Sequence, residues 1–212
     1  MLESKSCRAL GEDVALVIAL STSHSSGKAV QLERPREATI GELALTLGAH
    51  ATTALGPMAS AALGAGGTLA LEGPAALRLE LSGTYYAPQT VKFDQHPSDG
   101  AKMKLLRAGL RLCRLWSLSA IDLGGCVGGQ LFRLAGTGFG SAVVSRSGVS
   151  TLGGPSLGVF ARLQLSDRLA LLFAADGVVQ LARDSFVFGV FGLLHKPSSF
   201  ALQLFLASEV RL

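Results

Sequence analysis

The stretch that decides the fold is Leu77-Arg-Leu-Glu-Leu-Ser-Gly-Thr-Tyr85, in which apolar and polar residues alternate. Leucine or tyrosine fills most odd positions, and the even positions hold Arg78, Glu80, Ser82 and Thr84. Successive side chains of a β-strand point to opposite faces, so this period of two predicts a strand with one apolar and one polar face.

The same alternation recurs in seven further segments, which makes eight in all. They cover about residues 42–52, 59–72, 77–85, 106–113, 121–131, 156–165, 168–181 and 202–212. An even number of antiparallel strands can close into a barrel that leaves no strand edge unpaired. We therefore predict an all-β fold, an eight-stranded antiparallel up-and-down barrel that crosses a membrane.

The composition excludes an ordinary soluble domain. Hydrophobic residues make up 49% of the chain and charged residues only 16%, against roughly 25% in typical globular domains. No run of about 18 apolar residues is present, so a membrane-spanning helix is not expected. Apolar residues spread over every second position of many strands explain both facts. The formal charge of +4 is scattered, which speaks against a nucleic-acid partner.

The polar face indicates which side of the barrel meets lipid. A soluble, lipocalin-like ligand-binding barrel is the alternative, but its exterior would be rich in lysine. Here the polar face is mostly small and its charges nearly balance, as expected for a lumen in which buried charges are paired. The predicted lumen charge network is Glu42, Glu72, Arg78, Glu80, Arg107, Arg111, Asp122, Arg162, Arg168, Asp176, Glu209 and Arg211.

Residues 1–38 form a separate N-terminal part. We expect a helix over residues 6–20, a polar linker over 21–38, and the barrel over 39–212. The apolar segment Val14–Leu20 is short and follows two acidic residues, so it does not resemble a secretory signal. The longer connections, at about 88–101, 134–151 and 182–198, are predicted to be external loops, with both chain ends in the periplasm.

At this level the chain resembles the small outer-membrane proteins of the OmpA or OmpX type. The resemblance covers about residues 39–212 and lies in the pattern, including the C-terminal strand Phe200–Leu212. That family usually ends in phenylalanine, whereas this chain ends in Leu212. The resemblance implies a bacterial outer-membrane location, outer-membrane lipid as surroundings, and recognition of the last strand by the barrel-assembly machinery.

Few residues suggest chemistry. Cys113 and Cys126 flank one predicted hairpin turn and could form a disulfide or stay free. His50 is interpreted as a lumen hydrogen-bonding residue, and neither a metal site nor a cofactor is expected. Tyr85, Tyr86 and Trp116 are predicted to lie at the membrane interfaces.

An eight-stranded lumen is just filled by side chains. We therefore expect a structural or surface-interaction role through the external loops, and no enzymatic activity. The alternatives are a narrow channel for small solutes and a lipid-modifying enzyme at the rim. Such an enzyme would use His96 as general base, with Ser98 as nucleophile and Asp94 or Asp99 as orienting acid.

Overall fold

The computed structural model describes residues 43–93, 96–118, 120–140, 147–181, 186–188, 192–195 and 197–212. The predicted helix over 6–20, the linker over 21–38 and Glu42 lie outside these residues. Within them, no helix has the length and apolar character needed to span a membrane.

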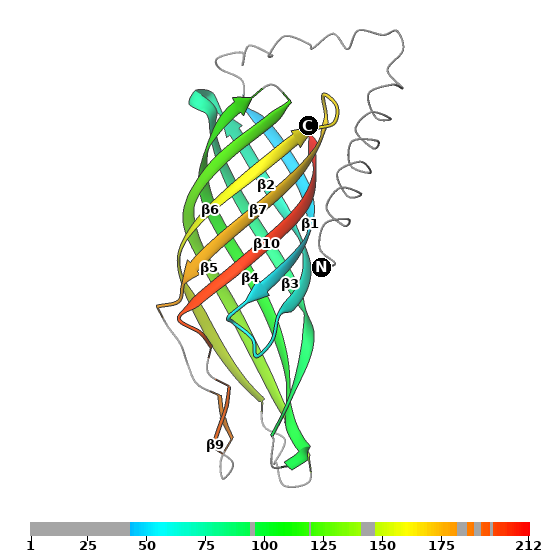
Figure 1. The fold of residues 1–212 in the computed structure, drawn as a ribbon, viewed down its shortest axis with the longest axis vertical. Helices are drawn as coiled ribbons and strands as arrows, with labels where there is room; N and C mark the ends of the chain where they lie inside the picture. Colours follow the sequence, from blue (N-terminus) through cyan, green and yellow to red (C-terminus); the bar gives the residue numbers. More distant parts are fainter. Residues whose placement is uncertain are drawn as a thin grey trace, which may run out of the picture. The chain divides into compact units, whose positions relative to one another are not determined.

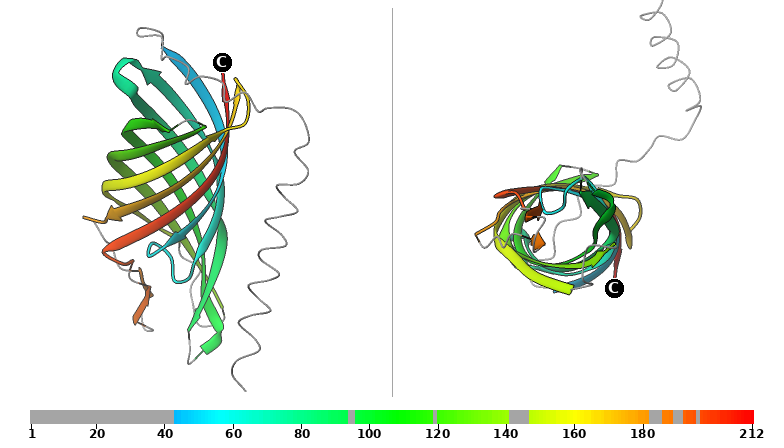
Figure 2. Two further views of the ribbon diagram at one scale, coloured as in Figure 1. Left: turned by 45° about the horizontal axis from the view of Figure 1, so that its top comes forward. Right: turned by 90° about the horizontal axis from the view of Figure 1, so that it is seen from below.

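Eight antiparallel strands close into one barrel (Figures 1 and 2), which confirms the predicted fold class. The closed order is β1-β2-β3-β4-β5-β6-β7-β10, with every strand beside its barrel neighbour in sequence. The strands are β1 (Ala44–Leu55), β2 (Ala62–Gly73), β3 (Leu77–Phe93), β4 (His96–Leu118), β5 (Ile121–Phe139), β6 (Ser147–Gln164), β7 (Leu169–Val179) and β10 (Phe200–Arg211).

The two ends of the barrel differ. At the end that holds the C-terminus, strands are joined by the short helix η1 (Pro74–Ala76) and by residues 119–120 and 165–168. At the other end, β3 and β4 project beyond the rest of the barrel (Figure 1), and residues 180–199 join β7 to β10. Outer-membrane barrels have short periplasmic turns and longer external connections, so the projecting end is the outer one.

Two predicted loops are largely strand, and this corrects the sequence analysis. The predicted loop at 88–101 is occupied by the ends of β3 and β4, which leave only residues 94–95 between them. The predicted loop at 134–151 is shortened in the same way by β5 and β6. The third, at 182–198, contains the paired strands β8 (Phe186–Phe188) and β9 (Gly192–His195).

The longer strands were missed because their polarity inverts towards the outer end. On β4, Leu110 and Leu112 point outward while Arg107 and Arg111 are buried. Farther out on the same strand, Lys102 and Lys104 are exposed. Their inward-facing neighbours there are Met103 and Leu105, both fully buried. The period of two persists, but the apolar face moves from the outside to the inside of the barrel.

The outer part of the lumen therefore has an apolar core. We call this cluster the apolar plug; it consists of Ala54, Met58, Ala62, Tyr86, Met103, Leu105, Phe132, Leu134, Leu152, Val178 and Ala201. Its members come from all eight barrel strands and from the β1–β2 connection. Outside a bilayer, water surrounds the wall, so apolar side chains gain free energy by turning inward.

Candidate functional site

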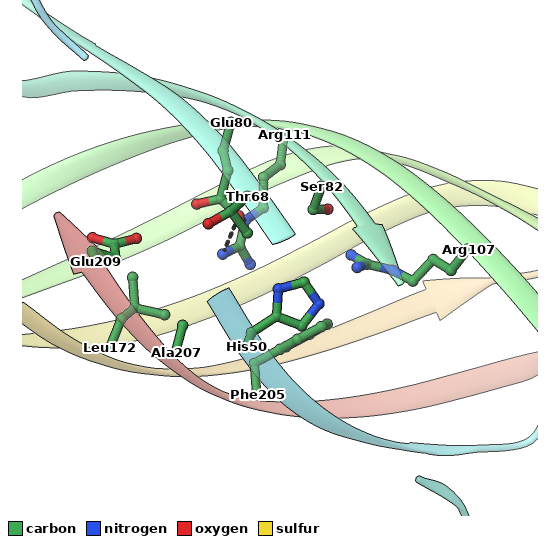
Figure 3. A pocket seen from close by; sticks show the side chains of 10 residues that line it. All are labelled: His50, Thr68, Glu80, Ser82, Arg107, Arg111, Leu172, Phe205, Ala207 and Glu209. Carbon is green, nitrogen blue, oxygen red and sulfur yellow. Dashed lines mark hydrogen bonds and ion pairs between the residues drawn. The ribbon is translucent and has the colours of Figure 1, made fainter. Parts of the chain in front are cut away.

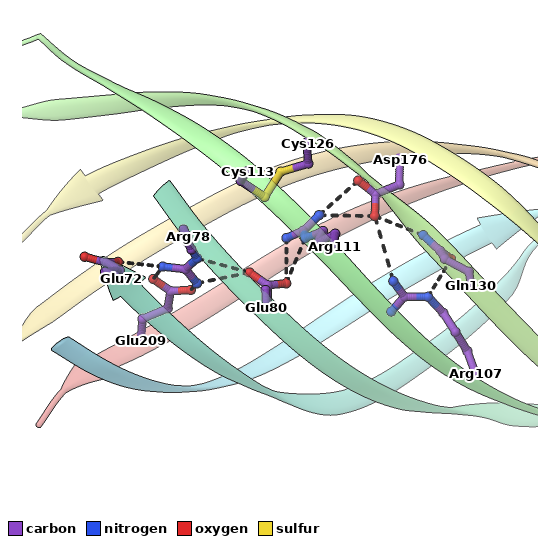
Figure 4. Close-up of a disulfide and its surroundings, with 10 residues drawn as sticks. All are labelled: Glu72, Arg78, Glu80, Arg107, Arg111, Cys113, Cys126, Gln130, Asp176 and Glu209. Atoms are coloured by element: carbon purple, nitrogen blue, oxygen red, sulfur yellow. Dashed lines mark hydrogen bonds and ion pairs between the residues drawn. A yellow bond between two sulfur atoms is a disulfide. The ribbon is translucent and has the colours of Figure 1, made fainter. Parts of the chain in front are cut away.

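Arg78 is the centre of the lumen charge network (Figure 4). Its guanidinium is fully buried and contacts three carboxylates, which belong to three strands. Nη1 donates to Glu72 at 2.9 Å, Nη2 donates to Glu80 at 3.1 Å, and both nitrogens donate to Glu209. Glu209 on β10 is a non-local partner, 131 positions away, whereas Glu72 is opposite Arg78 in the β2–β3 hairpin. Arg78 thus ties β2, β3 and β10 together inside the barrel.

Arg111 continues the network toward the outer end. Its Nε and Nη2 donate to Glu80 at 2.9 and 2.8 Å, and its Nη1 donates to Asp176 at 2.9 Å. Asp176 also accepts from Gln130 at 3.1 Å and lies 3.8 Å from Arg107. Arg107 in turn donates to Gln130 at 2.7 Å and lies over the ring of a neighbouring phenylalanine.

Arg162 extends the network toward the periplasmic end. It donates to Glu72 and, at 2.8 Å, to Asp122. Asp122 also accepts from Gln164 at 3.1 Å. The lumen is thus crossed by one chain of ion pairs. Its carboxylates outnumber its arginines by one, since the members are Arg78, Arg107, Arg111, Arg162, Glu72, Glu80, Asp122, Asp176 and Glu209.

Three residues of the predicted network lie elsewhere. Glu42 is outside the described residues. Arg168 is exposed in the β6–β7 turn, and Arg211 is exposed at the end of β10, so placing them in the lumen was wrong. Both keep the phase of the alternation, but the barrel ends before their side chains are enclosed. The period of two gives the face of a residue and not its distance from the rim.

Small residues leave room for these charged groups. A Cβ atom at Gly158 would lie 1.9 Å from Oδ1 of Asp176, and one at Gly109 would lie 2.9 Å from Nη2 of Arg107. A side chain at either position would displace a member of the network. Glycine on the polar face is therefore part of how the lumen accommodates long charged side chains.

His50 lies beside a small cavity in the network (Figure 3). Its Nε2 and the Thr84 hydroxyl are 2.8 Å apart, and its ring meets that of Phe205 edge-on at 5.6 Å. The cavity next to it has a volume of about 10 Å³ and is bounded by Glu80, Arg107 and Arg111. That volume is about the smallest that holds one water molecule. The described side chains therefore leave room for about one water molecule at this point of the lumen.

Cys113 and Cys126 are directly opposite on β4 and β5 and form a disulfide with an S–S distance of 2.07 Å. Both point into the lumen and are almost fully buried. In a Cys7→Ser background treated with dithiothreitol and then an alkylating agent, we expect the folded protein to stay unmodified. The heat-unfolded protein, whose disulfide dithiothreitol reduces to two thiols, should gain two alkyl groups by mass spectrometry. Alkylation of the folded barrel at the same rate would contradict this burial.

The three predicted interface aromatics divide between the two faces. Tyr85 and Trp116 point outward, and their relative residue exposures are 47% and 53%. Tyr86 is fully buried in the apolar plug, so its prediction as an interface residue was wrong. Adjacent residues of a strand point to opposite faces, so Tyr85 and Tyr86 cannot both reach the membrane.

Similar architectures occur among solved structures. Ail of Yersinia pestis, in complex with the heparin analogue sucrose octasulfate, is 8% identical with a TM-score of 0.52; the match covers 82% of this chain and 99% of Ail. A major outer-membrane protein of Thermus thermophilus is 13% identical with a TM-score of 0.62, over 80% of this chain and 99% of the other. No protein-family model and no curated protein sequence matches the chain.

The fold is that of small outer-membrane barrels. The exterior agrees with it, because large apolar side chains are exposed on every barrel strand. This apolar belt includes Leu45, Leu47, Leu69, Leu71, Leu79, Leu81, Leu110, Leu112, Leu123, Val127, Leu157, Val159, Phe173, Leu204 and Leu206. Water does not tolerate a continuous apolar surface of this extent, whereas a bilayer requires it. The belt and the fold together place the protein in a bacterial outer membrane.

Proposed function

We propose that this protein is a non-conducting outer-membrane barrel that presents its projecting outer end as an interaction surface. The observation that carries the proposal is the closed lumen. The charge network occupies the lower part and the apolar plug the outer part, and the cavity beside His50, within the charge network, measures about 10 Å³. A solute pathway would require both regions to open, so a narrow channel is the less well supported function.

The outer end is suited to presenting a surface. β3 and β4 stay paired up to Lys92 and Gly100, and β5 and β6 stay paired up to Thr137 and Ser147. Inter-strand hydrogen bonds and a packed apolar core hold such a wall in one conformation. Ail has the same fold and was solved with a polysulfated ligand, which supports a binding role for a barrel of this kind.

We expect the purified protein to give no discrete conductance steps in planar lipid bilayers. Its insertion would be checked separately by the different gel mobility of unheated and boiled samples. The Phe132→Ala variant removes a fully buried ring from the apolar plug and so tests whether the plug keeps the lumen closed to ions. Regular steps in the wild-type protein that vanish in Phe132→Trp would show a real channel and overturn the proposal.

We further propose that the protein is not an enzyme. Among the rim residues considered, Ser98 donates a hydrogen bond to Asp99 at 3.2 Å, His96 begins β4, and Asp94 lies outside the described residues. A lipid-hydrolysing activity that disappears in His96→Ala would contradict this. Recognition of β10 by the barrel-assembly machinery stays a prediction from the family resemblance.

A further inference from the structure

Four exposed cations lie at the outer ends of β3, β4 and β5, namely Lys92, Lys102, Lys104 and Arg133, and the last three are taken as one group. Lys102 and Lys104 lie on β4 and Arg133 lies on β5; all three point outward and are exposed. We call them the outer cation cluster. Lys102 and Lys104 lie between the predicted loop at 88–101 and the predicted strand at 106–113, and Arg133 lies just beyond the predicted strand at 121–131. Their common face became evident only with the strand register.

The register makes the cluster contiguous. Lys104 pairs with Ala135, and Arg133 is two residues from Ala135 on the same face of β5. Side chains in such diagonal positions on neighbouring strands are about 7–8 Å apart. Lys102 follows two residues beyond Lys104 on β4. One phosphate group can therefore be reached by two of these side chains at once.

The cluster has no acidic neighbour on its own face. In the described strands, Asp and Glu side chains point into the lumen, and Asp167 lies in a turn at the opposite end. Three outward neighbours of the cluster are threonines: Thr90 and Thr137 pair with Lys102 on either side, and Thr151 pairs with Arg133. The positive charge is thus not neutralised within this wall, and the hydroxyls add hydrogen-bond donors.

The position of the cluster identifies the surroundings it meets. On β4 the next outward residues toward the periplasm are Leu106, Ala108, Leu110 and Leu112, and on β5 they are Leu131, Gly129 and Val127. Tyr85, which pairs with Leu106, marks the same border on β3. The cluster therefore begins where the apolar belt ends, on the outer side. Lipid headgroups occupy that level of a bilayer.

We propose that Lys102, Lys104 and Arg133 bind phosphate groups of lipid headgroups in the outer leaflet. Arginine grips phosphate with two parallel hydrogen bonds, and lysine adds a mobile point charge. The cluster lies on the side wall at the belt's edge, so headgroups reach it by lateral diffusion, whereas a soluble polyanion would have to displace them. The proposal rests on the outward orientation of the β3–β4 end, and it holds whether or not the barrel conducts.

The test measures binding of a bisphosphorylated lipid A to the full-length protein in detergent micelles by native mass spectrometry. The triple variant Lys102→Gln/Lys104→Gln/Arg133→Gln should bind about a hundredfold more weakly, at about fivefold for each charge removed. The control, Arg114→Gln/Arg168→Gln/Arg211→Gln, removes three exposed cations at the periplasmic end and should change binding less than threefold. The single variants Lys102→Gln and Arg133→Gln, expected to lose about fivefold each, replace the triple variant if it does not fold.

Three results would overturn the proposal. Equal losses in the two triple variants would mean that only net charge matters. Undiminished binding of the same lipid without its phosphates would mean that the acyl chains alone are recognised. Dependence on the cluster for sucrose octasulfate but not for lipid A would assign this wall to soluble polyanions. None of these results bears on conductance, so the proposed non-conducting role is judged separately.

Discussion

Replacing Arg78 by methionine is expected to destabilise the barrel by about 3–5 kcal/mol. The substitution keeps an unbranched chain of similar length but removes the guanidinium that joins Glu72, Glu80 and Glu209. Glu209 would then lie buried beside Glu80 with no cation between them. Urea unfolding in lipid vesicles can be followed by the fluorescence of Trp116, the single tryptophan, which faces outward on β4.

The matched control is Arg168→Met, which removes an exposed arginine from the β6–β7 turn and should cost less than about 1 kcal/mol. Adding Glu209→Gln to Arg78→Met removes one of the stranded charges and should restore part of the loss. If Arg78→Met were no more harmful than Arg168→Met, the lumen would have to admit enough water to solvate the carboxylates. The closed lumen, and with it the proposed non-conducting role, would then be in doubt.

The chain of ion pairs also explains how one register is selected. Its members lie on β2, β3, β4, β5, β6, β7 and β10, and each pair joins inward positions on different strands or successive inward positions of one strand. A slip of one residue in any of these seven strands would carry a charge to the lipid face and an apolar residue into the lumen. The network therefore penalises misregistered barrels more strongly than it stabilises the correct one.

Much of this organisation is present in the sequence. Alternation is a local property, so it assigns a face to each residue within a strand, and every network member that the structure encloses was placed on the polar face. Its phase also brought Cys113 and Cys126 to the same side. What alternation does not contain is the pairing: Arg162 reaches Glu72 across 90 positions, and only the closed topology brings them together.

The apolar plug was missed for a different physical reason. The apolar face was expected to stay outside along the whole barrel, so no strand was predicted over residues 86–105. The strand in fact passes from lipid into the headgroup layer and water. Apolar residues therefore face outward within the lipid and inward beyond that border. The signal was available in Ala101-Lys-Met-Lys-Leu105, which alternates as regularly as residues 77–85 but with the opposite phase relative to the lumen.

An arginine placed on the lipid face should reveal this border directly. Leu110 lies in the middle of the outward apolar row of β4 and is 53% exposed. Leu110→Arg should cost about 2–4 kcal/mol in a bilayer, because the charge must enter hydrocarbon. Thr137→Arg, at an outward and exposed position of β5 beside Lys102, should cost less than about 1 kcal/mol. Both are measured by reversible urea unfolding in lipid vesicles.

The difference between the two costs reports the effect of the surrounding medium, because both positions point outward, are exposed and lie on neighbouring strands. In a soluble barrel, exchanging an exposed leucine for arginine would be neutral or favourable, so the sign of the Leu110→Arg effect separates a membrane barrel from a lipocalin-like one. Equal costs at Leu110 and Thr137 would place both inside the bilayer and move the border outward, away from Lys104. A large cost at Leu110 alone fixes the border between them, at the level where the outer cation cluster begins.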